Sequence, residues 1–235
     1  MIPPRGILWE GKSPVDGGPI VAIATDGTKN RKTGDMVQVW IMRSDLRPDA
    51  AARLGLDASV CGDCRHRGDG VKRSCYVTLV QAPLSIFRTF TAGGYSHVPL
   101  SALRGERIRW GAYGDPGMLP FPLVAEVCAG ARGWTGYTHQ WRNLPSYWSR
   151  YLMASTDTTR EQNEARAAGW RTFRVRPHGT NETRDEISCP ATPEGGGRSQ
   201  CERCLLCSGT GLHARNAPSI SVYGHGPLAG TRASV

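Results

Sequence analysis

Residues 151–175 read YLMASTDTTREQNEARAAGWRTFRV, and this order of residue types predicts a strand, a helix and a second strand. The helix is expected over 158–168, because Ala, Glu, Gln and Arg are strong helix formers. It starts with a Thr followed three residues later by a Glu, the spacing of a capping box, and a Gly follows its last residue. The flanking segments, 151–155 and 172–175, have the length and composition of strands. The stretch therefore predicts a βαβ unit with two parallel strands.

The same alternation of strands and helical segments extends along the chain in both directions. Strands are predicted at 36–42, 107–112, 134–139, 151–155, 172–175 and 219–223, and helical segments at 76–91, 121–131 and 158–168. Strands that alternate with helices form a parallel sheet covered by helices. We therefore predict an α/β fold, either an open sheet or a partial (β/α)6 barrel. A further strand at 19–25 is a candidate hairpin partner of the strand at 36–42.

Composition divides the chain into four parts. Residues 1–35 are rich in Gly and Pro and are expected to form an N-terminal extension of strand and loop. Residues 36–180 carry the alternating pattern and form the main α/β domain. Residues 181–218 are expected to be a Cys-rich metal-binding insertion, and 219–235 the last strand and a tail.

Seven of the eight cysteines fall into two groups. The first cysteine set is Cys61-x2-Cys64-x10-Cys75, and the second cysteine set is Cys189-x11-Cys201-x2-Cys204-x2-Cys207. A C-x2-C pair places two thiolates on one turn, where both can face one metal. The four thiolates of the second set suit tetrahedral zinc or an iron–sulfur cluster, and the C-x2-C-x2-C run favours iron–sulfur. The alternative is a group of buried or redox-active thiols.

The first cysteine set offers only three thiolates. A [4Fe–4S] cluster held by three cysteines keeps one iron open for a substrate or cofactor. A zinc ion needs a fourth ligand, for which His66 is the nearest candidate, although its spacing from Cys64 is tight. Cys128 lies alone among apolar neighbours and is expected to be a small core residue.

Polar residues follow nearly every predicted strand, which is where ligands bind in parallel sheets. Gly114 and Asp115 follow the strand at 107–112, and His139 ends the strand at 134–139. We predict Asp115 and His139 as catalytic residues. The alternatives are that Gly-Asp-Pro-Gly is only a turn and that His139 is only a strand-end histidine.

The composition points to a protein of the cytoplasm with anionic partners. No segment approaches the length of apolar sequence that a membrane helix needs, and the N-terminus has no apolar run typical of a signal peptide. Eight cysteines in a reducing compartment favour metal ligands over disulfides. The formal net charge of +9 favours anionic partners, nucleic acid first among them.

The order of elements resembles that of the radical S-adenosylmethionine superfamily. Its members have a six-stranded partial barrel, three cysteines after the first strand that hold a [4Fe–4S] cluster, and a Gly-Gly-Glu-Pro type motif after the second. Here Cys61, Cys64 and Cys75 follow the strand at 36–42, and Gly114-Asp115-Pro116 resembles the second motif. The cysteine spacing differs from the C-x3-C-x2-C of the family.

The chain also resembles uncharacterised phage proteins with a C-x2-C…C-Tyr loop, a Gly-Asp turn and a Cys-rich tail, which implies a phage origin and the host cytoplasm. The superfamily resemblance implies that the first cysteine set holds a cluster that binds S-adenosylmethionine, with Gly114 and Asp115 against that cofactor. It also implies that the second set holds an auxiliary [4Fe–4S] cluster. The expected substrate is a nucleotide, a nucleic acid or another anion. The alternative is a zinc protein that binds nucleic acid in phage replication or regulation.

Overall fold

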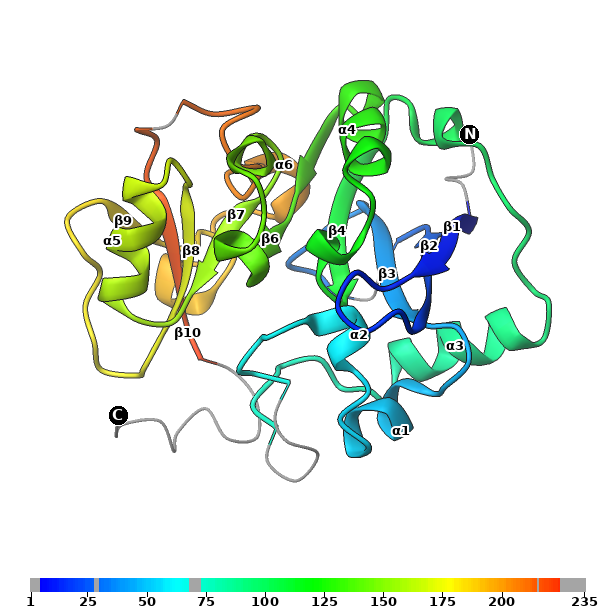
Figure 1. Ribbon diagram of the computed structural model, residues 1–235. Helices are drawn as coiled ribbons and strands as arrows, with labels where there is room; N and C mark the ends of the chain where they lie inside the picture. Colours follow the sequence, from blue (N-terminus) through cyan, green and yellow to red (C-terminus); the bar gives the residue numbers. More distant parts are fainter. Residues whose placement is uncertain (1–4, 28–29, 68–72, 215, 225–235) are drawn as a thin grey trace.

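The computed structural model describes residues 5–27, 30–67, 73–214 and 216–224, which contain two five-stranded sheets. The first sheet has the order β1 (Gly6–Lys12), β2 (Pro19–Thr25), β3 (Val37–Arg43), β4 (Arg107–Tyr113), β5 (Gly133–Thr135). The second has the order β6 (Tyr137–Thr138), β7 (Met153–Thr156), β8 (Thr172–Arg176), β10 (Ser219–Tyr223), β9 (Glu186–Ser188). Both sheets are visible in Figure 1.

Most of the strand pairs are parallel. β3, β4 and β5 pair in parallel, and so do all neighbours in the second sheet. β1 and β2 are antiparallel, and β2 pairs antiparallel with β3. The predicted α/β fold with a parallel sheet is therefore confirmed, and so is the hairpin between the strands at 19–25 and 36–42. Every residue of β3 is buried, as expected for a strand covered on both faces.

The chain passes from the first sheet to the second across a single residue, Gly136. β5 ends one residue before Gly136 and β6 begins one residue after it. A Cβ atom at Gly136 would lie 2.8 Å from Leu152 Cδ2 and 2.9 Å from Trp110 Cβ. Only glycine fits this close packing. The predicted strand at 134–139 is thus two short strands in different sheets.

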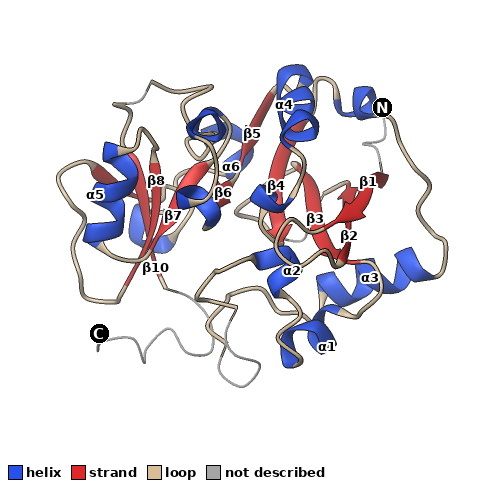
Figure 2. Cartoon of the chain, viewed as in Figure 1, coloured by secondary structure: helices blue, strands red, loops and turns tan. Residues whose placement is uncertain are grey.

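The helices lie on the outside of the strands (Figure 2). They are α1 (Pro48–Arg53), α2 (Ala58–Cys61), α3 (Ala82–Thr91), α4 (Phe121–Gly130), α5 (Thr159–Ala167) and α6 (Cys201–Cys204). The 3₁₀ turns are η1 (Leu100–Leu103), η2 (Pro116–Met118), η3 (Gln140–Arg142), η4 (Ser146–Arg150) and η5 (Pro193–Gly195). None of the described helices is long and apolar enough to span a membrane.

The helix predicted at 158–168 is confirmed with its capping box. Thr158 Oγ1 accepts a hydrogen bond from Glu161 N at 3.1 Å, and a Glu161 carboxylate oxygen accepts from Thr158 N at 3.2 Å. The helical segment predicted at 76–91 is shorter than expected. Only α3 is helical, and it begins next to Pro83, which is tolerated in the first turn of a helix but not in its interior.

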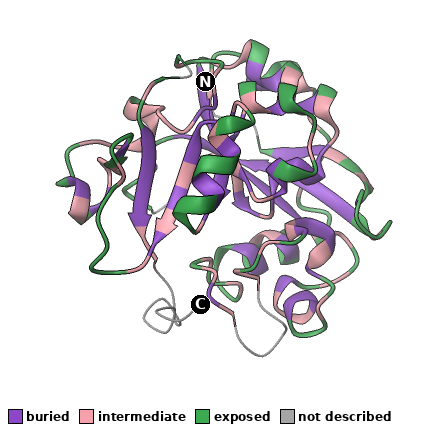
Figure 3. Cartoon of the chain, turned by 60° about the vertical axis from the view of Figure 1, so that its left-hand side comes forward, coloured by how far each residue is buried: buried purple, intermediate pink, exposed green. Residues whose placement is uncertain are grey.

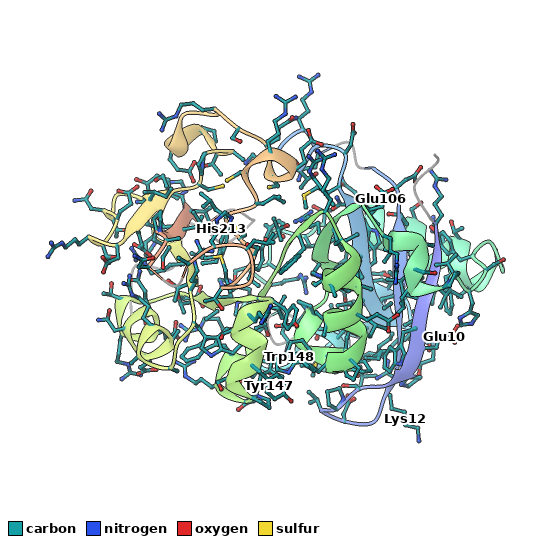
Figure 4. The ribbon with its side chains drawn as sticks, turned by 90° about the horizontal axis from the view of Figure 1, so that it is seen from above. Glu10, Lys12, Glu106, Tyr147, Trp148 and His213 are labelled. Atoms are coloured by element: carbon teal, nitrogen blue, oxygen red, sulfur yellow. The ribbon has the colours of Figure 1, made fainter. Side chains whose placement is uncertain are left out.

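The core lies between the sheets and the helices, and the strands in Figure 3 are mostly buried while the helices carry exposed residues on their outer faces. Trp110 of β4 is 1% exposed, and its indole nitrogen donates to the Sγ atom of Cys128, 3.3 Å away. Cys128 itself is 2% exposed, so its predicted place in the core is confirmed. Figure 4 shows Tyr147 and Trp148 next to each other on η4, and both rings pack edge-on against Phe121 of α4.

Gly114 → Ala is expected to lower the free energy of unfolding by about 2–3 kcal/mol. Gly114 has a φ of +80°, and a Cβ atom there would meet the backbone carbonyl oxygen of Ile41. Gly55 → Ala is the matched control, because Gly55 has a φ of +71° but open space around it, and it should cost only about 1 kcal/mol. Equal losses in denaturant unfolding of the two variants would show that the contact with Ile41 carries no cost.

Candidate functional site

Both cysteine sets open into one cavity. The cavity has a volume of about 580 Å³ and is lined by residues of β4, β5, β6, β8 and β10 and of the loops that follow β3, β7 and β9. Cys64 and Cys75 of the first set line it, and so do Cys189, Cys201 and Cys207 of the second. Two groups that are more than a hundred residues apart in the chain therefore contribute to the same site.

The first cysteine set lies in the loop that follows β3, as predicted. Cys61 is the last residue of α2, and Cys64 N donates to Cys61 O at 3.2 Å in the turn that joins them. Cys75 is brought back to this turn by its backbone N–H, which donates to His66 O at 2.9 Å. Burial raises the pKa of the Cys64 thiol, and the nearby backbone N–H groups of His66 and Arg67 oppose that rise.

The second cysteine set is fixed to the sheets by backbone hydrogen bonds. Cys189 N donates to Ser221 O of β10 at 2.9 Å, and Cys201 N donates to Lys32 O, just before β3, at 2.8 Å. Gly136 N, at the point where the two sheets follow each other, donates to Cys207 O at 2.8 Å. The thiols are therefore held at defined positions by the main fold.

The side chain of Arg171 fixes the backbone around Cys207 by hydrogen bonds. Its side chain is 1% exposed, and its guanidinium donates to the backbone carbonyl oxygens of Leu206, Gly209 and Pro218 at 2.6, 3.0 and 2.8 Å. The positive charge of Arg171 also acts on the thiol of Cys207. A buried cation at this position stabilises thiolates that lose their protons to a metal.

Burial raises the pKa of four of the thiols and so favours their protonated form while no metal is bound. Desolvation raises the pKa of Cys64 to about 12 and that of Cys201 to about 11, and it raises the pKa values of Cys61 and Cys207 well above the ordinary range. A nucleophilic or redox-active cysteine needs a lowered pKa. These four thiols are therefore poor nucleophiles, whereas a metal can displace their protons.

The thiol groups of the described cysteines do not form a compact group of three. Four thiolates on one zinc, with Zn–S bonds of about 2.3 Å, lie about 3.8 Å from one another by tetrahedral geometry. In the described residues, no three cysteines have sulfur atoms that all lie within 4.8 Å of one another. In a [4Fe–4S] cluster each thiolate binds a different iron, so its thiolates stand further apart than those on one zinc ion.

A group of nitrogen and oxygen ligands lies in the same cavity. His66, His139 and Asp157 each offer one atom, and these three atoms all lie within 4.8 Å of one another. His66 Nε2 is 2.6 Å from Asp157 Oδ1, and the rings of His66 and His139 are 5.6 Å apart. Burial lowers the pKa of His139 to about 4, so its imidazole is neutral near pH 7.

The wall of the cavity is aromatic and carries cations. Tyr137 and Phe173 stack with ring centroids 4.4 Å apart, and Arg176 lies over the ring of Tyr223 at 4.0 Å. Arg109 donates to Gln38 Oε1 at 3.1 Å and to Tyr76 OH at 3.0 Å. Within the described ranges no carboxylate pairs with Arg109, so its charge is available to an anionic ligand.

Four of the predicted site residues lie outside the cavity wall, namely Cys61, Gly114, Asp115 and Cys204. Asp115 is 6% exposed, and its carboxylate accepts from Gly117 N and from His139 N, each at 2.8 Å. Burial raises the pKa of this carboxyl group to about 6. Asp115 thus fixes the turn and the backbone of His139, and its predicted contact with a cofactor stays a prediction.

Several cavity residues were not singled out from the sequence, namely Arg109, Tyr137, Phe173, Arg176 and Tyr223. Their signal is alternation along the parallel strands, since Arg109 shares its strand with the buried Ile108 and Trp110. No protein-family model matches the chain, and neither a curated protein nor a solved structure matches it, so the interpretation of the site depends on its own geometry.

Proposed function

We propose that the chain is an iron–sulfur protein in which two clusters face one substrate cavity. The observation that carries the proposal is that cysteines of both sets line the same cavity of about 580 Å³. A zinc ion that only stabilises a loop is fully coordinated by protein ligands, so its cysteines are not expected to line a large cavity. Two redox groups at one cavity are instead suited to catalysis.

We further propose that the enzyme is of the radical S-adenosylmethionine type. β3, β4, β5 with β6, β7, β8 and β10 would be the six parallel strands of a partial barrel, joined at Gly136. Cys61, Cys64 and Cys75 would hold a [4Fe–4S] cluster at the carboxyl end of β3, with one iron open toward the cavity. When bound, this cluster supplies the electron for reductive cleavage of S-adenosylmethionine.

The second cluster would be held by Cys189, Cys201, Cys204 and Cys207. Its place next to Arg109 supports an auxiliary role, because the charge of Arg109 acts on the thiol of Cys201. The substrate would be anionic and planar, such as a nucleotide. Arg109 supplies the cation for the anionic group, and Tyr137 and Phe173 supply rings against which a base can stack.

The first test is metal and sulfide analysis of protein purified without oxygen, together with its visible spectrum. Brown protein with iron and acid-labile sulfide sufficient for two clusters is the expected result. The reduced protein is then expected to convert S-adenosylmethionine to 5′-deoxyadenosine, and iron-loaded protein that forms none would rule out the radical mechanism.

Colourless protein with stoichiometric zinc would contradict the iron–sulfur proposal. In that case the charge of +9 directs the next experiment to nucleic acid. The logarithm of the affinity for DNA or RNA should then fall with the logarithm of the salt concentration.

A further inference from the structure

We infer that His66, His139 and Asp157 bind one divalent transition-metal ion in the cavity. This site goes beyond the proposed function, since it uses imidazole and carboxylate ligands and none of the seven cysteines of the two sets. The three residues belong to loops at the carboxyl ends of β3, β6 and β7. Their ligand atoms all lie within 4.8 Å of one another, close enough for one ion to contact all three after small side-chain rotations.

The three side chains are held in place by a second layer of contacts. His66 Nδ1 lies 3.2 Å from Ser74 Oγ, which directs Nε2 toward Asp157 Oδ1. Arg65 Nε lies 3.2 Å from Asp157 Oδ2, the other carboxylate oxygen. Metal-binding histidines are typically oriented in this way by a hydrogen bond at the second ring nitrogen.

The backbone contributes to the same arrangement. Asp157 N donates to Glu161 Oε2 at 2.7 Å, and His139 N donates to Asp115 Oδ2 at 2.8 Å. The backbones of Asp157 and His139 are therefore held in place, in addition to the contacts of the side chains. A site whose ligands are already oriented binds a metal with little loss of side-chain freedom.

His139 provides the observation that calls for a ligand. Its Nε2 atom is buried, and in the described part of the chain it has no hydrogen-bond partner. A buried polar atom without a partner is costly, and native structures usually provide one. A metal ion between the two imidazoles and the carboxylate would be that partner. The ion would take the place of the proton that His66 Nε2 donates to Asp157 Oδ1, and that proton would pass to solvent.

The ligand set indicates the class of metal. Two imidazoles and one carboxylate suit first-row ions such as Fe²⁺ and Mn²⁺, and they leave coordination positions open. These positions face the cavity, because all three residues line it. The soft thiolates of the two cysteine sets favour different groups, so the two kinds of site do not compete for one metal.

Mn²⁺ is the probe for the test, because it prefers nitrogen and oxygen ligands over thiolates. Titration of the full chain with Mn²⁺, followed by electron paramagnetic resonance of the free ion, is expected to show one bound ion per chain. His139 → Ala and Asp157 → Asn are each expected to weaken binding about tenfold or more, since even residues that only orient a ligand matter by 10–100-fold. Asp157 → Asn nearly preserves the shape of the side chain, which guards against loss of folding in the alanine variant.

The matched control is His97 → Ala. His97 is a histidine with a carboxylate 3.5 Å away, on Glu10, but its side chain is 70% exposed and lies outside the cavity. Its Mn²⁺ affinity should equal that of the unmodified chain. The inference is overturned if the unmodified chain binds no Mn²⁺, or if folded Asp157 → Asn and His139 → Ala bind it as tightly as the control.

Discussion

Replacing Cys201 and Cys204 together by Ser is expected to remove about half of the iron and acid-labile sulfide from protein purified without oxygen. Both residues belong to α6, and they supply two of the four thiolates of the second cysteine set. The first cysteine set lies on a different loop and should keep its cluster. Iron and sulfide per chain, with the visible spectrum, measure the effect.

Cys128 → Ser is the matched control for this double variant. Cys128 belongs to neither set, and a serine hydroxyl can accept the hydrogen bond that Trp110 Nε1 gives to the sulfur. The control should keep all of its iron. An unchanged iron content in the Cys201 and Cys204 variant would contradict a cluster at the second set, and so would an equal loss in the control.

The same comparison can separate the roles of the two sets. Replacing Cys61 and Cys64 by Ser should also remove about half of the iron, and it should in addition abolish any change of the spectrum on addition of S-adenosylmethionine. The Cys201 and Cys204 variant should keep that change. If both variants respond to S-adenosylmethionine alike, the cofactor does not bind at the first set.

Glu186 → Gln is expected to lower the free energy of unfolding by about 3–5 kcal/mol, because it leaves a buried guanidinium without its counter-charge. Arg174 and Glu186 pair through two hydrogen bonds of 2.8 and 2.6 Å, with side chains 5% and 0% exposed. The Glu186 carboxylate also accepts from Thr183 N at 2.9 Å. Denaturant unfolding followed by circular dichroism measures the loss.

The neighbouring Asp185 → Asn provides the control. Asp185 lies 3.1 Å from Arg166, but its side chain is 58% exposed, and exposed pairs contribute only about 0–1 kcal/mol. The two variants make the same chemical change at adjacent positions. Similar stabilities for both would mean that the burial of the Arg174 and Glu186 pair has no energetic consequence.

Local patterns predicted most of the elements from the sequence. α5 is set by its helix formers and its capping box, all of which lie within a few residues, and β10 is set by the β-branched residues of SISVY. β9 and α6 were not predicted, because they are only three and four residues long and carry little periodic signal. β1 was missed for a different reason: its pattern of residues is irregular, and a shift of register interrupts its pairing with β2.

The candidate site was predictable in its parts but not as a whole. The two sets could be recognised from the spacing of the cysteines, because thiolates that bind one metal ion or cluster often lie close together in the sequence. His66 and Asp157 are 91 positions apart in the sequence, and no local pattern indicates that their side chains come into contact. The shared cavity likewise depends on how β4, β6 and β10 are arranged in space, which is a property of the folded chain.

The hydrogen bonds of Arg171 bear on whether the chain folds before or after any metal binds. Arg171 satisfies three carbonyl groups of the segment from Leu206 to Pro218, and Gly136 satisfies that of Cys207. In classical zinc fingers the metal itself organises the chain, and the apoprotein is unfolded. Here the polypeptide itself supplies those contacts, so we expect the chain to fold without metal; under the proposed function, a cluster would then enter an already folded site.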